Sequence, residues 1–291
     1  QPLVVGATQV RLSMRVLVTG AGGQLGTDVV AELTDRHEVL ACEHGKLDIA
    51  DADSVLGHLT SVCPNVIVNC AAWTAVDACE DDPAQANRIN GAGPTNLVVA
   101  AEAIGARIVH ISTDYVFDGT KPTPYVETDE PNPASAYGWS KFLGERAMRP
   151  EDTVLRTAWV MGPHGSNMLK TVLRLLDGES TLRFVHDQRG CPTFTGDLAK
   201  AVGWFVDDHH PGLYHVTNAR PVSWYELARE IADLSGHDSA RILPIAAADL
   251  DPPRTAPRPA NSVLENRALR ESGLPGLRDH REALADTLSG P

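Results

Sequence analysis

Short apolar runs alternate with helix-like segments through the first half of the chain. Five runs rich in Val, Ile and Leu are typical of strands buried on both faces. Between them, apolar residues recur three and four positions apart, as in amphipathic helices. Buried strands that alternate with helices form a parallel sheet covered on both faces. The predicted strands are Arg15–Thr19, Glu38–Cys42, Asn65–Asn69, Arg107–Ser112 and Thr153–Val160.

The intervening helices follow from the same pattern. Leu25–Leu33 has one apolar face, and Asp51 is a suitable N-cap for a helix that runs to Leu59. A long helical stretch, interrupted near Gly91–Pro94, ends near residue 104, and Tyr137–Met148 forms the next helix. Right-handed crossovers between parallel strands then give an α/β fold with a doubly wound parallel sheet of the Rossmann type.

After about Gly162 the pattern is less regular. Ser223 and Glu226 form a capping box that opens a helix. The proline-rich segment Pro252–Pro259 is predicted to be an extended connector. The other predicted elements are helices over Asn167–Leu176, Thr195–Val206, Glu265–Arg270 and Asp279–Leu288, and strands over Thr181–Val185 and Leu213–Val216.

Composition excludes several classes of protein. The net charge is −13, from 25 Lys and Arg against 38 Asp and Glu, which disfavours nucleic acid as a partner. No apolar stretch approaches the ~18 residues that a membrane helix needs. Five cysteines without a C-x-x-C pair favour a reduced, cytoplasmic protein.

A glycine-rich loop joins the first strand to the first helix. Its G-x-x-G-x-x-G pattern is Gly20, Gly23 and Gly26, with Gln24 and Leu25 at the start of the helix. Glycines at these positions allow a tight turn and a close approach of the backbone to a diphosphate, which meets free N–H groups of the helix. Because a strand precedes the loop and a helix follows it, the pattern predicts a dinucleotide site rather than a simple turn.

Two carboxylates follow the second strand. Glu43 lies where an acid binds a ribose 2′-hydroxyl, and Asp48 is near enough to meet the adenine amine. Both residues also fit the interpretation of plain surface carboxylates. No Arg follows the strand directly, although Lys46 is near, so the choice between NADPH and NADH as cofactor stays open.

A Tyr-x-x-x-Lys pattern supplies the candidate chemistry. Tyr137 and Lys141 are one helical turn apart, so the phenol and the ammonium share a face. An ammonium lowers the pKa of a nearby phenol, which then exchanges a proton with a carbonyl oxygen more readily. The same spacing also occurs by chance in many helices. Thr113 comes directly after a buried strand, at the ligand-binding edge of the sheet, where its hydroxyl can polarise the same carbonyl.

Several motifs carry a resemblance to a known family. The segments VTGAGGQLG, STDYVFDG, YGWSK, RTAWVMG, DQRGCPT and RPANS resemble the extended short-chain dehydrogenases/reductases, and more narrowly the dTDP-4-dehydrorhamnose reductases, from about Met14 to the end. The resemblance implies that dTDP-4-dehydro-β-L-rhamnose is reduced at its C4 ketone by NADPH or NADH. Tyr137 would be the general acid, Lys141 would tune it and bind ribose, and Thr113 would assist. Asn90 matches the helix Asn of a water-linked proton path.

The resemblance also assigns binding residues. The diphosphate loop is matched by Gly23, Gln24 and Leu25, and the adenine site by Asp48 and Ile49. Residues placed beneath the cofactor are Ala71 and Ala72, and those placed at the sugar nucleotide are Thr113, Asp114, Tyr115 and Trp159.

Some residues depart from the family pattern or keep two interpretations. Trp73 stands where His or Tyr is expected. Trp159 fits a core residue as well as a substrate contact. Arg254 and Arg258 fit diphosphate ligands or solvated charges. The acids of metal-bridged relatives have no match, so no metal is predicted, and Asp207–His210 is expected to be a solvated turn.

The predicted organisation has two domains and an extension. Residues 14–162 form the NAD(P)-binding Rossmann domain, to which segments near 193–220 return; 163–192 and 221–291 form a smaller α+β substrate-binding domain; and Gln1–Ser13 is a disordered extension. A monomer or a homodimer fits equally. Two alternative functions remain: a non-catalytic, cofactor-binding regulatory subunit, since a fold does not fix a function, and another sugar-nucleotide epimerase or reductase of the superfamily.

Overall fold

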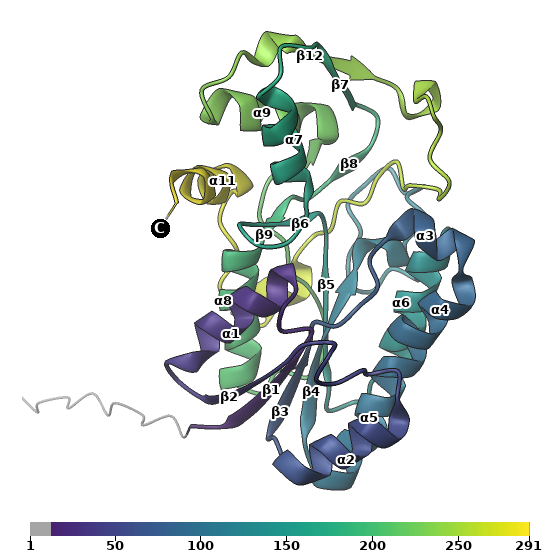
Figure 1. Ribbon diagram of the computed structural model, residues 1–291, viewed down its shortest axis with the longest axis vertical. Coiled ribbons are helices and arrows are strands. Elements are labelled where there is room, and N and C mark those ends of the chain that lie inside the picture. Colours follow the sequence, from purple (N-terminus) through teal and green to yellow (C-terminus); the bar gives the residue numbers. More distant parts are fainter. Residues whose placement is uncertain (1–12, 291) are drawn as a thin grey trace, which may run out of the picture.

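Six parallel strands form the central sheet, in the order β10-β5-β4-β3-β1-β2 (Figure 1). The computed structural model describes residues 13–290. The predicted doubly wound parallel sheet is therefore confirmed. Its strands are β1 (Arg15–Thr19), β2 (Glu38–Cys42), β3 (Val66–Asn69), β4 (Arg107–Thr113), β5 (Thr153–Thr157) and β10 (Gly212–His215).

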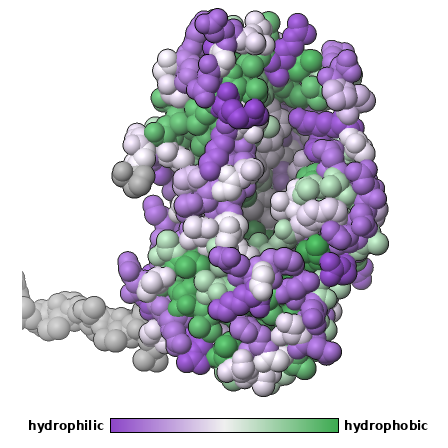
Figure 2. Space-filling view, in the orientation of Figure 1, coloured by the Kyte–Doolittle hydropathy of each residue, from purple (hydrophilic) through white to green (hydrophobic). Residues whose placement is uncertain are grey.

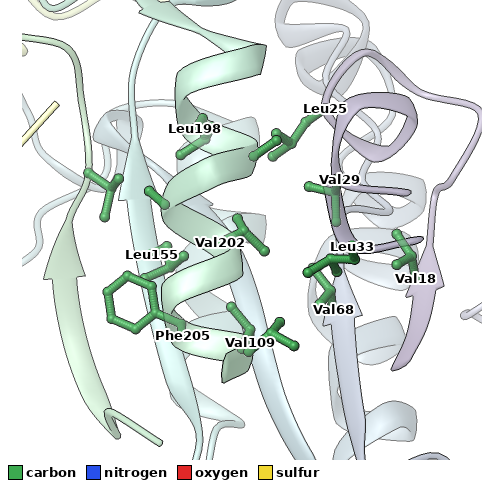
Figure 3. Packing of buried hydrophobic residues seen from close by; sticks show 14 of the residues in the cluster. Val18, Leu25, Val29, Leu33, Val68, Val109, Leu155, Leu198, Val202 and Phe205 are labelled. Carbon is green, nitrogen blue, oxygen red and sulfur yellow. The ribbon is translucent and has the colours of Figure 1, made fainter. Parts of the chain in front are cut away.

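Helices cover both faces of the sheet. α1 (Gln24–Thr34) and α8 (Thr195–Asp207) pack on one face with Val202, Phe205 and Leu155 in a core closed to solvent (Figure 3). α2 (Ala52–Val62) and α5 (Gly93–Ile104) cover the other face. α6 (Ala136–Arg146) lies beside them and contacts β4. Asp51 caps α2 as predicted, with its carboxylate accepting from the Ser54 amide at 3.1 Å.

A smaller region stands above the carboxyl edge of the sheet (Figure 1). Helices α7, α9 and α11 pack around a separate apolar cluster, and three two-stranded ladders connect them. The capping box of Ser223 and Glu226 is confirmed at the start of α9. The bounds are α7 (Met168–Leu176), α9 (Trp224–Leu234), α10 (Arg267–Glu271), α11 (His280–Ser289), β6 (Val160–Met161) with β9 (Thr193–Phe194), β7 (Leu182–Val185) with β12 (Ile242–Ile245), and β8 (Arg189–Gly190) with β11 (Val222–Ser223).

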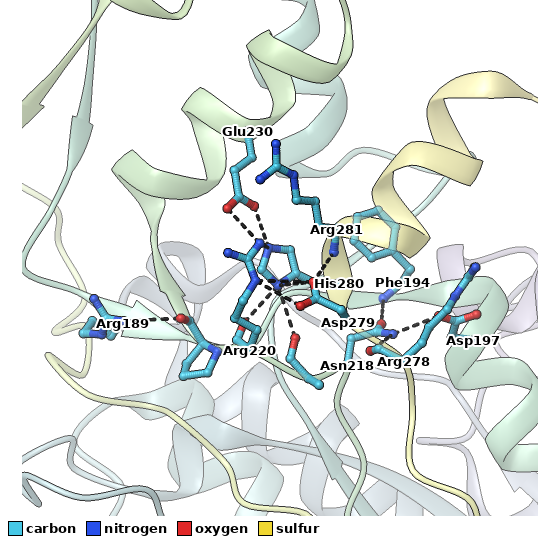
Figure 4. A network of polar contacts seen from close by, with 12 residues as sticks. Arg189, Phe194, Asp197, Asn218, Arg220, Glu230, Arg278, Asp279, His280 and Arg281 are labelled. Atoms are coloured by element: carbon cyan, nitrogen blue, oxygen red, sulfur yellow. Dashed lines mark hydrogen bonds and ion pairs between the residues drawn. The ribbon is translucent and has the colours of Figure 1, made fainter.

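A polar network ties α9 and α11 to the segment after β10 (Figure 4). The His280 ring is fully buried, with Nε2 2.7 Å from the Glu230 carboxylate and Nδ1 2.9 Å from the Arg220 carbonyl oxygen. Arg220 also pairs with Glu230 at 2.8 Å. Asn218 donates to the Asp197 carboxylate at 2.8 Å, which joins the network to α8. We call these residues, together with Arg278 and Asp279, the α9–α11 network.

The structure corrects two predicted elements. The expected strand Thr153–Val160 breaks after Thr157, because Trp159 adopts a left-handed backbone conformation with a φ of +47°. The interrupted helical stretch resolves into several pieces: α3 (Val76–Asp81), α4 (Pro83–Asn87), a π-helical segment (Arg88–Ala92) and α5.

The prediction of a solvated turn at Asp207–His210 was wrong for Asp207. Its side chain is only 4% exposed, pairs with Arg36 and lies 2.8 Å from His37 Nε2. Both partners come from the turn between α1 and β2, which folds over the end of α8. The sequence separation of about 170 residues hid this contact.

Other expectations concern features that the structure describes only in part. The extension Gln1–Ser13 lies, apart from Ser13, outside the described residues. Within 13–290, no helix is both long and apolar enough to span a bilayer, and no group of three or more His, Cys, Asp or Glu residues could hold a metal ion. All five cysteines have free thiols.

Candidate functional site

The glycine loop leaves no room for side chains. Gly20 has a φ of +65°, and a Cβ atom there would lie 2.7 Å from the Ala71 amide nitrogen. At Gly26 a Cβ would lie 2.1 Å from the Gly20 carbonyl oxygen. Helix α1 begins directly after Gly23 with no acidic residue in its first turn. Its free N–H groups and positive dipole end therefore face the loop, which makes a cradle for a diphosphate.

One cavity, of about 520 Å³, runs from this loop along the end of β2. The side chain of Glu43 borders it and passes within about 3.2 Å of the position of a Gly22 Cβ atom. Lys46 Nζ turns away and donates to the Ala41 carbonyl at 3.2 Å. The predicted cofactor residues that line this cavity are Gly20, Gly23, Glu43, Asp48, Ile49, Ala71 and Ala72.

A second cavity, of about 610 Å³, lies over the carboxyl ends of β4 and β5. It shares Gly23, Cys70 and Ala72 with the first, so the two cavities adjoin. Figure 2 shows a recess in this face of the molecule, between the sheet and the smaller region. The predicted residues that line the second cavity are Gly23, Gln24, Leu25, Ala72, Thr113, Asp114, Tyr115, Tyr137, Lys141 and Trp159.

Tyr137 and Thr113 meet inside this cavity. Ser135 caps α6 and accepts from the Gly138 amide at 3.1 Å, which fixes the turn that carries Tyr137. The Thr113 hydroxyl lines the same cavity and favours the phenolate of Tyr137, against the larger effect of burial on the pKa of the phenol. Burial raises the pKa of Tyr137 above its ordinary value, in contrast to the predicted lowering, because desolvation penalises the phenolate. The phenol is consequently held protonated, as a proton donor must be.

Lys141 is buried on the same face of α6. Its Nζ donates to the Ile111 carbonyl of β4 at 2.7 Å. Burial lowers the pKa of Lys141 to about 8, while the charge of Glu145 opposes the shift. The ammonium therefore keeps most of its charge at neutral pH, next to the phenol and the cavity.

Asp114 adds a buried carboxyl at the end of β4. It accepts from the Thr113 hydroxyl at 3.0 Å, and its Oδ2 is buried. Burial raises the pKa of Asp114 to about 6. Such a group is a strong acceptor for a hydroxyl of a bound sugar once it is ionised.

Asn90 lies outside both cavities. Its Oδ1 accepts from the Trp73 amide at 2.8 Å, and its Nδ2 donates to the Trp73 carbonyl and to Ser140 Oγ, each at 3.0 Å. The π-helical segment carries this side chain between the loop after β3 and α6. In the structure the Asn90 side chain holds Trp73, which borders the first cavity, and its hydrogen bonds go to Trp73 and Ser140.

Trp224 is a cavity residue that the sequence analysis missed. Its indole stacks on Trp159, with ring centroids 3.5 Å apart and an interplanar angle of 7°. Both rings line the larger cavity, one from the break after β5 and the other from the first turn of α9. A tryptophan inside an amphipathic helix pattern carries no signal that separates a cavity wall from a core position.

The two arginines of the proline-rich connector have partners of their own. Arg258 pairs with Asp77 at 2.7 Å, and Arg254 donates to the Gln188 side chain at 3.1 Å. Neither lines either cavity, although both lie near enough to act electrostatically on Tyr115. The structure therefore brings them to the rim rather than into the site.

Known proteins resemble this chain in sequence and fold. The model of a family described as the RmlD substrate binding domain matches residues 14–290. The chain belongs to this family. The spore coat polysaccharide biosynthesis protein SpsK of Bacillus subtilis is 44% identical to this RmlD-family chain over 278 residues, 94% of the chain and 96% of SpsK.

Two further relatives of the RmlD-family chain are reductases by name. The dTDP-4-dehydrorhamnose reductase of Mycolicibacterium smegmatis is 40% identical over 285 residues, 96% of this chain and 86% of the relative. The crystal structure of dTDP-4-dehydrorhamnose reductase from Bacillus anthracis, in complex with NADP, has a TM-score of 0.91 at 32% identity and covers 96% of this chain and all of that one. The resemblance predicted from the motifs is confirmed.

Proposed function

We propose that this protein reduces the C4 ketone of dTDP-4-dehydro-β-L-rhamnose to dTDP-L-rhamnose with NADPH or NADH, the last step of dTDP-rhamnose biosynthesis. The observation that carries the proposal is the meeting of Tyr137, Thr113 and Lys141 in a cavity that adjoins a diphosphate cradle. The reductases among its relatives supply the identity of the substrate.

The residues of the chain fit the cofactor. Side chains at Gly20 or Gly26 would collide with the backbone of Ala71 or of Gly20, so these glycines allow the tight loop that leaves the N-terminus of α1 open to a diphosphate. Gly23, Gln24 and Leu25 would hold the diphosphate, Glu43 the ribose, and Asp48 and Ile49 the adenine, with Ala71 and Ala72 beneath. When bound, the cofactor supplies a hydride.

Tyr137 then acts as the general acid. Its protonated phenol donates to the carbonyl oxygen as negative charge develops there, and the Thr113 hydroxyl polarises the same oxygen. Lys141 stabilises the phenolate that remains and binds the cofactor ribose. Asn90 acts indirectly, by holding the loop at Trp73 against α6.

The sugar nucleotide would lie in the larger cavity. Asp114 and Tyr115 border it beside Thr113, and Trp159 offers an aromatic face to a base or a sugar ring. We propose that residues 14–162, with segments near 193–220, form the cofactor domain, and that 163–192 and 221–291 form the substrate domain. We also propose a cytoplasmic monomer or homodimer, in keeping with the five free thiols.

The test is reduction of dTDP-4-dehydrorhamnose, made in place from dTDP-glucose by the two preceding enzymes. Loss of NAD(P)H absorbance is followed with the native protein and with Tyr137→Phe. We expect native turnover, and a fall in kcat of about 100-fold or more in the variant, with cofactor affinity unchanged. Cofactor binding without turnover would favour the regulatory-subunit alternative. Turnover of a different 4-keto sugar nucleotide would favour the other enzymes of the superfamily.

A further inference from the structure

A buried ion pair lies behind Lys141 and lines neither cavity. Arg156 of β5 and Glu145 of α6 form a two-pronged contact, with Nε 2.9 Å from Oε1 and Nη2 2.6 Å from Oε2. The Ser112 hydroxyl donates to the same Oε1 at 2.5 Å. The side chains of Arg156 and Glu145 are only 3% and 7% exposed. The RTAW segment thus contributes an arginine for which the proposed reaction has no direct use.

The surroundings of Arg156 hold it toward Glu145. Its guanidinium carbon lies 5.0 Å from the centre of the Phe117 ring. His215 lies on another side, and burial together with the charge of Arg156 lowers the pKa of His215 to about 3. With a neutral imidazole and an aromatic ring around it, Arg156 finds its negative counter-charge in Glu145.

Glu145 in turn lies one helical turn beyond Lys141, on the same face of α6. Lys141 faces three other titratable groups: Cys70 after β3, His110 of β4 and Tyr137 one turn earlier. Burial raises the pKa of Cys70 to about 12 and that of Tyr137 still further, and it lowers the pKa of His110, so these groups are neutral near pH 7. Glu145 is thus the acid whose charge opposes the effect of burial on the pKa of Lys141.

We propose that the Glu145–Arg156 pair is a positioning device that keeps the ammonium of Lys141 charged beneath the cavity, so that Tyr137 works as an acid over a wider range of pH. Glu145 stands one turn of α6 beyond Lys141 and acts on it through its charge, and the guanidinium of Arg156 holds the Glu145 carboxylate in place. Ser112, the neighbour of Thr113 on β4, ties the carboxylate to the strand that carries the site.

The pairing with Arg156 also has a reason in the burial of Glu145. A single buried carboxylate would take up a proton and lose its effect on Lys141. A two-pronged arginine contact gives the carboxylate a counter-charge and fixes its orientation. The pair therefore holds the Glu145 carboxylate in one place, one turn of α6 from Lys141.

The first test is Glu145→Gln, which keeps the shape and the hydrogen-bonding oxygen but removes the charge. Two readouts test the inference. The first, the pH dependence of kcat/KM, rests on the proposed reduction. We expect the alkaline limb of that profile to move down by about one pH unit, because Lys141 loses its proton more easily. An unmoved limb in a folded variant overturns the inference.

A double variant separates positioning from folding. Glu145→Gln strands a buried arginine and can unfold the protein, whereas Glu145→Leu with Arg156→Met replaces the whole pair by apolar side chains, a change that folded proteins often tolerate. We expect the double variant to fold and to keep the shifted limb. A double variant with the native pH profile overturns the inference. Asp152→Asn is the matched control, since it breaks a buried pair with Arg149 at the opposite end of β4 and should leave the limb in place.

The second readout needs no sugar substrate. NADH and NADPH affinities are measured by fluorescence between pH 6 and 9 for the native protein, Glu145→Gln and Asp152→Asn. We expect the affinity of Glu145→Gln alone to fall at a lower pH than that of the native protein, since Lys141 holds the cofactor ribose. Identical titrations contradict the pair's role, whereas a shifted titration without sugar turnover refutes only the proposed reaction.

Discussion

The two regions of this molecule are held together by different forces. The sheet region is a stack of apolar layers in which Val16, Val18, Val109 and their neighbours are closed to solvent. The smaller region has an apolar cluster too, but the α9–α11 network fastens its helices through charged and amide groups (Figure 4). Non-directional apolar packing holds the sheet region together, whereas directional hydrogen bonds and ion pairs fix how the helices of the smaller region are oriented. The cavity lies where the two meet.

A core truncation in the sheet region should have the largest effect. Phe205 of α8 is fully buried against the sheet (Figure 3). Phe205→Ala should lower the free energy of unfolding by about 4 kcal/mol, from lost burial and the cavity left behind. Urea unfolding measures this loss. The exposed Val99→Ala on α5 is the control, and an equal loss there would contradict the contrast between buried and exposed apolar residues.

Low pH should destabilise the fold through the buried His215. The pKa of His215 is about 3 in the fold against 6.5 in an unfolded chain, because burial disfavours the imidazolium. Its contribution is intact above pH 6.5 and is lost progressively as the pH falls toward 3. Urea midpoints measured across this range should fall, and less steeply in His215→Gln. Parallel curves for the two proteins would refute the assignment to His215.

Breaking the α9–α11 network should cost less than the core truncation and act on a different readout. Glu230→Gln removes the charge that faces His280 and Arg220, and we expect a loss of about 2 kcal/mol. The KM for the sugar nucleotide should rise while cofactor affinity stays unchanged, because Glu230 lies on α9 of the smaller region and lines neither the glycine loop nor its cavity. Calorimetry with NADPH and steady-state kinetics decide this. Weaker cofactor binding would show that the two regions are not separable in this way.

The smallest effect is expected at a helix end. Ser223→Ala removes one half of the capping box of α9 and should cost about 1 kcal/mol. Thermal unfolding measures it, with the exposed Ser54→Ala as a control that keeps its backbone amide bonded to Asp51. A change in sugar-nucleotide KM larger than that of Glu230→Gln would show that the helix cap, rather than the network, sets the pose of α9.

The sheet region could be predicted from sequence far better than the smaller region and its contacts. Val66–Asn69 and its fellow strands are apolar on both faces, and that pattern depends only on neighbours along the chain. Gly20 and Gly26 likewise stand in a local strand–loop–helix context. Trp224 and Asp207 find partners far away in sequence, and no periodicity records such contacts. The φ of Trp159 is imposed by tertiary packing against Gly190 and Trp224, so the predicted strand ran through a position where the chain turns.

The sheet is completed late in the chain. Strand β10 (Gly212–His215) and helix α8 follow α7 and β7 of the smaller region, yet they close the edge of the sheet and cover α1. For protein engineering this means that the cofactor half is not a detachable module. A fragment that stops at Gly162 would expose the apolar faces of β5 and α1, and grafting a new substrate region requires three splice points rather than one. An exchange of the substrate region should therefore leave residues 193–220 with the host sheet, because α8 and β10 belong to it.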